Sequence, residues 1–143
     1  MDGTVYFGCR DSNLYAVEAA TGQKKWAFNN KGSWVIGSPA VRDGKVYFST
    51  SDSAKLYGLD AKSGTQDFVL DMKWLMFSSP ALVDRTLYIG THEGKLFAVD
   101  VTAQRVLWEF QTESSKKHGP AMTTADGKPD YAAVFKENST TIW

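Results

Sequence analysis

The sequence predicts an all-β fold made of repeated four-stranded antiparallel units, and two periodic features support this prediction. Apolar, strand-like runs begin about 40 residues apart, at Val5, Val46 and Leu87. A Pro-Ala pair recurs with nearly the same period, at Pro39, Pro80 and Pro120. Repeats of this length that contain only short strands and turns are typical of β-propeller blades. The chain is therefore predicted to be a β-propeller.

One repeat shows the four strands of a blade separated by turn residues. The expected strands, named A to D along the chain, cover residues 39–41, 45–50, 55–60 and 66–70. Asp43 and Gly44 are expected to form a tight turn between strands A and B, because both residue types tolerate positive φ. Strand B is apolar on both of its faces, which predicts that neighbouring sheets cover each sheet on both sides.

The repeat divides the chain into about three and a half blades. Residues 1–30 supply strands B to D of one blade, residues 31–71 and 72–111 supply two full blades, and residues 112–143 supply strands A to C of a fourth. The strands of this fourth blade are expected at residues 120–124, 131–136 and 140–143.

Such a chain is expected to form an incomplete ring, since propellers typically close with about four to eight blades. We interpret it as a piece of a longer propeller, and the alternative is a dimer of two half-rings. Under either interpretation the open sheet edges favour self-association. Residues 1–4 contain neither the basic nor the apolar segment of a signal peptide.

The composition excludes several classes of function. Sixteen basic residues balance sixteen acidic ones, so the chain lacks the positive field that attracts nucleic acid. No apolar stretch approaches the roughly 18 residues that a membrane-spanning helix needs. Cys9 is the single cysteine, which excludes a disulfide within the chain and a zinc site with two cysteine ligands.

Residues 16–26 carry a motif that ends in a tryptophan. They read Ala-Val-Glu-Ala-Ala-Thr-Gly-Gln-Lys-Lys-Trp, and weaker copies end at Phe68 and Trp108. The pattern resembles the tryptophan-docking motif of the PQQ-like (quinoprotein-type) propeller repeat family, with Glu18 in place of an aspartate. The resemblance covers essentially the whole chain. It implies that Trp26, Phe68 and Trp108 are structural residues that lock neighbouring blades together.

The resemblance also implies a set of functions and a location. The family contains dehydrogenases that hold pyrroloquinoline quinone with calcium, non-catalytic BamB-like scaffolds and extracytoplasmic sensor domains. The dehydrogenases resemble one another in a vicinal cysteine pair, calcium-ligating carboxylates and a catalytic aspartate. A chain with only Cys9 cannot supply that pair, and none of its carboxylates lies in a motif that matches the calcium ligands. A periplasmic or other extracytoplasmic location follows from the resemblance.

The connections between blades contain an unusual concentration of large apolar residues. Five of them could form a partner-binding face on the side where these connections meet the loops between strands B and C: Trp34, Met72, Trp74, Met76 and Phe77. The alternative, which we favour, is that they pack between the blades. The acidic residues Asp11, Asp52 and Glu93 recur in the loops between strands B and C, where we expect turn formation rather than a ring of carboxylates.

These observations favour a non-catalytic module that binds a protein or peptide partner and has no cofactor. Part of a quinone-dependent dehydrogenase, with pyrroloquinoline quinone and calcium, and the ligand-sensing domain of a receptor are the alternatives. No catalytic, cofactor-binding or metal-binding residue is predicted from the sequence.

Overall fold

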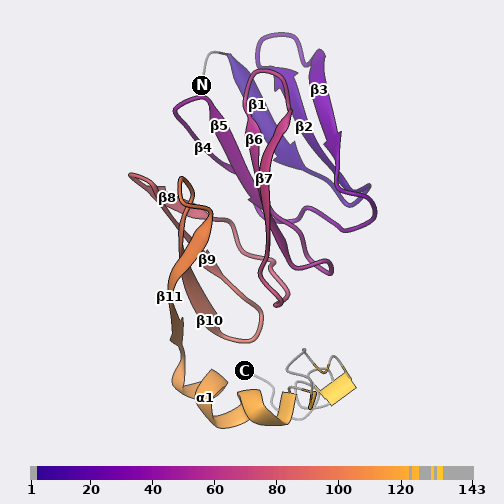
Figure 1. Ribbon diagram of the computed structural model, residues 1–143. Helices are drawn as coiled ribbons and strands as arrows, with labels where there is room; N and C mark the ends of the chain where they lie inside the picture. The colour runs from indigo at the N-terminus through magenta and orange to yellow at the C-terminus, as the bar shows by residue number, and fades with distance from the viewer. Residues whose placement is uncertain (1–2, 123, 126–129, 131, 134–143) are drawn as a thin grey trace.

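In the computed structural model, the chain is described except for residues 1–2, 123, 126–129, 131 and 134–143. The described part consists mainly of three antiparallel β-sheets, which follow one another along the chain (Figure 1). The second sheet lies between the first and the third (Figure 1). The prediction of an all-β incomplete propeller is confirmed.

Each sheet is a meander in which strands adjacent in sequence are hydrogen-bonded. The first sheet contains β1 (Thr4–Gly8), β2 (Asn13–Glu18) and β3 (Lys24–Asn29). The second contains β4 (Ala40–Arg42), β5 (Lys45–Ser49), β6 (Lys55–Asp60) and β7 (Gln66–Asp71). The third contains β8 (Ala81–Val83), β9 (Thr86–Gly90), β10 (Lys95–Asp100) and β11 (Arg105–Gln111).

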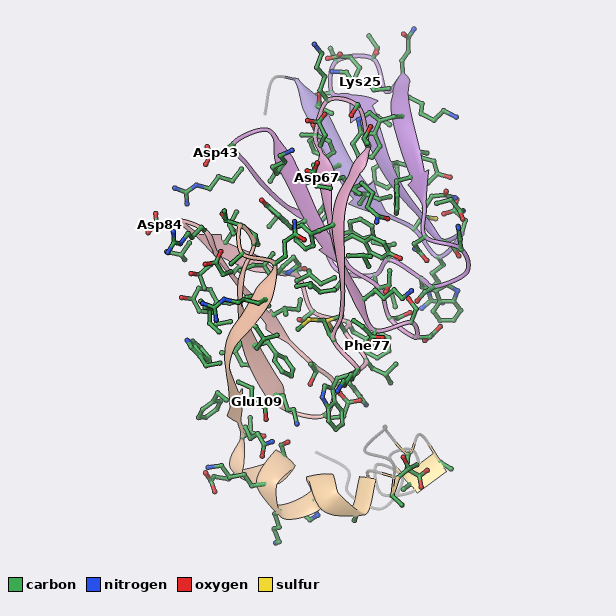
Figure 2. All side chains as sticks on the ribbon, in the orientation of Figure 1. Lys25, Asp43, Asp67, Phe77, Asp84 and Glu109 are labelled. Carbon is green, nitrogen blue, oxygen red and sulfur yellow. The ribbon has the colours of Figure 1, made fainter. Side chains whose placement is uncertain are left out.

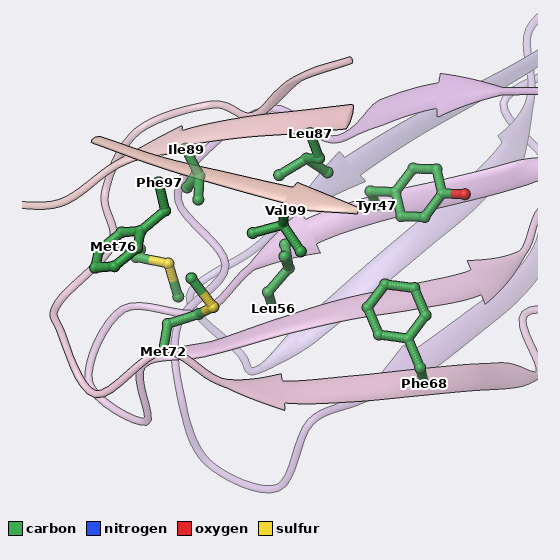
Figure 3. Packing of buried hydrophobic residues seen from close by; sticks show 9 residues of the cluster. All are labelled: Tyr47, Leu56, Phe68, Met72, Met76, Leu87, Ile89, Phe97 and Val99. Carbon is green, nitrogen blue, oxygen red and sulfur yellow. The ribbon is translucent and has the colours of Figure 1, made fainter. Parts of the chain in front are cut away.

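The core lies in two layers between the sheets. The first layer joins the first and second sheets, with Leu14, Val46, Phe48, Tyr57 and Leu59 as central residues. The second layer joins the second and third sheets through Tyr47, Leu56, Phe68, Met72, Met76, Leu87, Ile89, Phe97 and Val99 (Figure 3). Because side chains alternate along a strand, Val46 and Phe48 face the first sheet while Tyr47 faces the third.

Each sheet carries an aromatic pair at the same register. Tyr6 pairs with Trp26, Tyr47 with Phe68 and Tyr88 with Trp108, at centroid distances of 5.7, 6.1 and 5.9 Å. In each sheet the pairing of the last two strands shifts in register directly beside the aromatic residue of the last strand. The repeat in sequence is therefore a repeat in three dimensions.

The aromatic pair of the first sheet, Tyr6 and Trp26, contacts the second sheet through one backbone carbonyl group. The Tyr6 hydroxyl and Trp26 Nε1–H both donate to the Ala61 carbonyl oxygen, at 3.0 and 3.1 Å. The Trp26 ring lies over Gly64, where an added Cβ would come within 2.7 Å of Trp26 Cδ2. The glycine of this turn thus leaves room for the neighbouring sheet's tryptophan.

The other two predicted structural aromatics lie in different environments. Phe68 is buried between the second and third sheets. Trp108 is exposed, since no described sheet covers the outer side of the third.

The expected fourth blade is wrong where the structure describes it. Instead of a strand that begins at residue 120, the chain forms helix α1 (Glu113–His118) and 3-10 helix η1 (Gly119–Met122). Thr112 caps α1 by accepting a 3.1 Å hydrogen bond from the Ser115 backbone N–H. Glu113 in the first turn and basic residues in the last turn suit the helix dipole. Residues 131–136 and 140–143, expected as further strands, lie largely or wholly outside the described residues.

The shared acceptor at Ala61 generates a testable prediction for stability. Tyr6→Phe and Trp26→Phe each remove one donor but leave the carbonyl with the other. Tyr6→Phe should lose about 1 kcal/mol in free energy of unfolding, and Trp26→Phe should lose more because it also removes part of the ring that lies over Gly64. The double variant leaves this part-buried carbonyl without either donor and should lose more than the sum of the two. Urea unfolding measures the three values.

Tyr88→Phe is the matched control, because Tyr88 occupies the equivalent position on the sheet whose outer side is exposed. Its free energy of unfolding should match that of the wild type. A strictly additive double variant would contradict the shared role of the Ala61 carbonyl.

Candidate functional site

The connections between sheets and the loops between the second and third strands of each blade lie at one end of the sheets. Backbone hydrogen bonds join them: Val35 N–H donates to the Cys9 carbonyl at 3.1 Å, and His92 N–H to the Leu75 carbonyl at 2.9 Å. Figure 2 shows Phe77 at the opposite end from the hairpin turns at Asp43 and Asp84. We call the residues Arg10, Trp34, Ile36, Trp74, Phe77, His92 and Lys95 at this end the loop face.

The first connection, between β3 and β4, is held by a buried asparagine. Asn30 Nδ2–H donates to the Ser33 carbonyl at 2.7 Å, and Ser33 N–H donates back to Asn30 Oδ1 at 2.9 Å. Between them Lys31 and Gly32 take positive φ values of 67° and 119°. Ser51 N–H then donates to the Trp34 carbonyl at 2.9 Å, which fixes the Trp34 backbone against the second sheet.

Side chains alternate between outside and inside along this connection. Trp34 is 41% exposed, Val35 is buried in the first core layer, and Ile36 points outward again. The second connection, between β7 and β8, repeats the end of this pattern: Met76 is fully buried and Phe77 is 39% exposed. Ile36 and Phe77 thus occupy equivalent positions, each directly after a buried residue and three before the proline.

The two connections contact each other where they approach their first strands. Ser38 N–H of the first connection donates to Ser79 Oγ of the second at 2.9 Å. Ser78 Oγ donates to the Gly90 carbonyl at 2.7 Å, which ties the second connection to β9. A Cβ at Gly37 would come within 2.4 Å of the Ser78 carbonyl oxygen, so this crossing requires a glycine. The outward residues Ile36 and Phe77 are therefore placed by backbone that is tightly constrained.

Arg10, Lys95 and the imidazole ring of His92 each contact one aromatic ring of the loop face. The Arg10 guanidinium lies 4.8 Å from the Trp34 ring centroid, and Lys95 Nζ lies 4.2 Å from that of Trp74. The His92 ring packs edge-on to Phe77, with centroids 5.7 Å apart. The loop face therefore combines apolar rings with positive or titratable groups.

The structure separates the five residues that the sequence assigned to a partner-binding face. Trp34 and Phe77 are exposed and Trp74 is partly buried. Met72 and Met76 are wrong as members of a partner-binding face, and the favoured alternative is confirmed for them, because they fill the layer between the second and third sheets (Figure 3). Ile36 was missed, although its offset from Pro39 equals that of Phe77 from Pro80. Arg10 and Lys95 were also missed, since no sequence spacing places them beside the tryptophans.

Glu93 differs from the other acidic residues of these loops. Both of its carboxylate oxygens are buried, and neither accepts a hydrogen bond of standard geometry from the part of the chain that the structure describes. Burial raises the pKa of Glu93 above its ordinary value of 4.5, and the weaker influence of Thr91 and the Leu75 backbone does not offset it. The Gly94 carbonyl accepts the Thr112 N–H at 3.0 Å, which ties this turn to the segment before α1.

Asp11 and Asp52 show no such burial. Asp11 Oδ1 accepts the Asn13 N–H at 3.0 Å, so it shapes its own turn as expected. The hydrogen bond from the Tyr15 hydroxyl to Asp11, at 2.5 Å, is the main cause that lowers the pKa of Asp11. Asp52 is exposed. Over the described residues, no three histidine, cysteine, aspartate or glutamate side chains gather in a group suited to a metal ion.

The stacked meander sheets with a repeated aromatic register define a propeller of the PQQ-like class. The family model described as outer membrane protein assembly factor BamB matches residues 1–138, and the chain belongs to this family. Across the described residues, no helix is long and apolar enough to cross a membrane.

Solved structures of two kinds share the fold. BamB from Moraxella catarrhalis is 26% identical, with a TM-score of 0.66 over 76% of this chain and 33% of that protein. The quinohemoprotein alcohol dehydrogenase ADHIIG from Pseudomonas putida HK5 is 25% identical, with a TM-score of 0.71 over 78% of this chain and 19% of that enzyme. The fold is thus common to an assembly factor and to an enzyme.

Two curated relatives show a similar breadth of function. The dehydrogenase subunit of the quinone alcohol dehydrogenase of Komagataeibacter europaeus is 28% identical over 153 aligned residues, which cover 88% of this chain and 21% of that subunit. The β-alanine-activating enzyme of Danio rerio is 26% identical over 68% of this chain and 9% of its own length. The chain therefore spans only a small part of these relatives.

The buried carboxylate generates a prediction for the pH dependence of stability. Because the pKa of Glu93 is higher in the folded than in the unfolded state, its contribution to stability is greatest below pH 4.5 and decreases as the pH rises through the folded value. Glu93→Gln removes this titration. The free energy of unfolding of the variant relative to wild type should therefore increase as the pH rises, as measured by urea unfolding at several pH values.

Asp52→Asn is the control, since Asp52 lies in the equivalent loop of the second sheet and is exposed. Its free energy of unfolding at neutral pH should stay within about 0.5 kcal/mol of that of the wild type. A Glu93→Gln difference that is flat with pH would contradict the raised pKa.

Proposed function

We propose that the loop face binds a protein or peptide partner and that the chain serves as a non-catalytic scaffold module. The observation that carries the proposal is the exposure of Ile36 and Phe77 at equivalent positions of consecutive connections, together with that of Trp34, two residues before Ile36. Large apolar groups held outward by constrained backbone are typical of interaction surfaces, where aromatic residues are enriched.

The charges of the loop face indicate what kind of partner it suits. Arg10 places an exposed cation over the Trp34 ring, so a binding segment meets apolar surface and positive charge together. Lys95 lies over the Trp74 ring, but it is largely buried and forms an ion pair with Glu109 at 3.5 Å. An apolar segment flanked by acidic residues would match both properties. We therefore assign the partner to proteins or peptides that carry such a segment.

The comparisons support a scaffold role and suggest where it operates. The matching family is described as outer membrane protein assembly factor BamB, and the Moraxella catarrhalis structure carries that name. Under this proposal the partner takes part in outer membrane protein assembly, and the protein works outside the cytoplasm.

Selection from a displayed library of random peptides tests the partner-binding surface. Peptides selected on the wild type should contain apolar and acidic residues, and Trp34→Ser and Phe77→Ser should each weaken their binding by about tenfold or more, as expected for truncation of a buried interface aromatic. Isothermal titration calorimetry measures the affinities, and thermal unfolding checks that the variants remain folded.

Val83→Ser is the matched control, because Val83 is an exposed apolar residue of β8 next to the hairpin turn at the other end of the third sheet. It should bind the peptides as tightly as the wild type does. Peptides that bind all four proteins equally would show that the loop face is not the binding surface.

Part of a quinone-dependent dehydrogenase is the second candidate, favoured by the similarity to quinone alcohol dehydrogenases over most of this chain. The described residues do not fit the cofactor site that the resemblance implies. They contain no cluster of three or more histidine, cysteine, aspartate or glutamate side chains suited to a metal ion, and Cys9 has no vicinal cysteine. No catalytic step is derived from them.

Titration of the chain with pyrroloquinoline quinone, with and without calcium, separates the two candidates. We expect tryptophan fluorescence to change no more than in a titration of free tryptophan, with no dependence on calcium. Saturable, calcium-dependent quenching would favour the dehydrogenase.

A further inference from the structure

The contact between a connection and the loop of the sheet that follows it occurs twice in the described structure. At the second sheet, Ser51 N–H donates to the Trp34 carbonyl, and at the third sheet His92 N–H donates to the Leu75 carbonyl, both at 2.9 Å. Trp34 and Leu75 each lie five residues before the proline that precedes the next strand, so the two contacts are equivalent. We call them the first loop contact (Ser51–Trp34) and the second loop contact (His92–Leu75).

The first loop contact is reinforced by a network of hydroxyl groups. Ser33 Oγ accepts the Ser53 N–H at 3.1 Å and lies 3.5 Å from Ser51 Oγ. Thr50 Oγ1 accepts the Lys55 N–H at 3.0 Å and lies 2.7 Å from Ser53 Oγ. Each of these hydroxyl groups has a hydrogen-bond partner within the protein, and hydroxyl groups of serine and threonine carry no charge. The first loop contact is therefore both satisfied and neutral.

The second loop contact lacks this network and contains a buried glutamate instead. The positions of Ser33 and Ser51 are occupied by Trp74 and His92, so their two hydroxyl groups are absent. Glu93 follows His92 and is only 8% exposed. Both of its carboxylate oxygens are buried, and no group in the described part of the chain gives them a hydrogen bond of standard geometry. A buried polar group in this condition costs free energy.

Glu93 is not needed to shape its own turn. In the first sheet, Asp11 accepts the backbone N–H of the first residue of β2. In the third sheet, Thr91 Oγ1 accepts the N–H of the first residue of β10 at 3.3 Å, so a hydroxyl group takes this role. Thr50 takes it in the second sheet, where Asp52 is exposed. Formation of the turn therefore does not account for the burial of Glu93.

The groups around Glu93 do not compensate its carboxylate. Thr91 and His92 of the same loop and the Leu75 backbone of the connection favour the charged form, but burial opposes it more strongly. The carboxyl group is thus enclosed between the loop and the connection without a matching partner.

The charged residues of the neighbouring elements are placed elsewhere. Lys73 of the connection is exposed. Lys95 of β10 forms an ion pair with Glu109 of β11 at 3.5 Å, and Glu113 of α1 forms one with Lys116 at 2.7 Å. The histidine of the same loop is therefore the neighbour whose change of charge must be separated from that of the buried glutamate.

We propose that the second loop contact is a pH-sensitive switch, closed while the Glu93 carboxyl group is protonated and opened when this group releases its proton to the solvent. The neutral acid is tolerated between the loop and the connection, whereas the carboxylate needs water or additional donors. It gains them when the loop moves away from the connection, which breaks the hydrogen bond from His92 N–H to the Leu75 carbonyl.

The direction of the switch follows from the burial of the group. Burial raises the pKa of Glu93 above its ordinary value of 4.5. The closed state is therefore most stable below pH 4.5 and loses stability as the pH rises through the folded value.

Opening of the second loop contact changes one side of the loop face. Phe77 lies two residues after Leu75, and its ring contacts the His92 ring at a centroid distance of 5.7 Å. Opening separates these two rings, while Trp34 stays held by the first loop contact. The switch does not depend on the proposed function, because it is defined by a hydrogen bond within the chain.

Amide hydrogen exchange, followed by NMR from below pH 4.5 to neutral pH, tests the switch. Protection factors are corrected for the pH dependence of intrinsic exchange. The His92 amide reports on the second loop contact, and the Ser51 amide on the first serves as the control within the same molecule. As the pH rises, we expect the protection of His92 to fall by about tenfold or more and that of Ser51 to change by less than about threefold.

Two variants separate the glutamate from the neighbouring histidine. Glu93→Gln keeps the shape of the neutral acid, so protection of the His92 amide should no longer depend on pH. His92→Gln removes the imidazole but keeps the backbone N–H, so the amide of residue 92 should retain the pH dependence of the wild type. Asp52→Asn, at the equivalent position of the exposed loop, is the matched control and should leave the protection at both contacts unchanged.

The proposal fails if the protection of the His92 amide follows that of Ser51 at every pH. It also fails if Glu93→Gln keeps the pH dependence of the wild type or if His92→Gln abolishes it, since either result would assign the effect to the histidine. Loss of peptide binding at the loop face would leave these exchange values unchanged, so failure of the proposed function is distinguishable from failure of the switch.

Discussion

The structure depends on packing sheets face to face, because every central strand is apolar on both of its sides. The second sheet shows this requirement clearly: Phe48 is buried against the first sheet while Tyr47, next to it, is buried against the third. A sheet of this kind is stable only when neighbours cover both of its faces. At the contact between the first two sheets, Trp26 of the last strand is set against Ala61 and Gly64 of the adjoining sheet. At the contact between the second and third sheets, Phe68 of the last strand is buried in the core layer.

The same requirement decides which residues the loop face can offer. Each connection must cross the edge of a core layer, so it contains both residues that complete the layer and residues that point outward. Val35 and Met76 complete the layers, and Ile36 and Phe77 point outward directly after them. The surface that we assign to a partner is thus a consequence of how the blades are joined. Glu93 lies in one of the same loops, where its burial sets it apart from Asp11 and Asp52.

Repetition also shows where one contact departs from its counterpart. The first loop contact is satisfied by the hydroxyl groups of Ser33 and Ser51, whereas Glu93 is buried beside the second without a standard hydrogen bond from the described residues. Because the two contacts share the same backbone hydrogen bond, the pH response that we propose for the second comes from its side chains and not from its backbone.

The sequence by itself determined the repeat, the strands of the three sheets and the positions of Trp26, Phe68 and Trp108, because alternation and turn residues are local properties. It did not distinguish Met76, which is buried, from Phe77, which is exposed, since adjacent apolar residues carry no mark of which neighbour covers them. It also missed α1, because the period of the repeat predicted a fourth blade there and the capping residue Thr112 was not recognised. Only the tertiary structure decided that Trp26 is covered while Trp108 is exposed, because that depends on the presence of a neighbouring sheet and not on the motif around the residue.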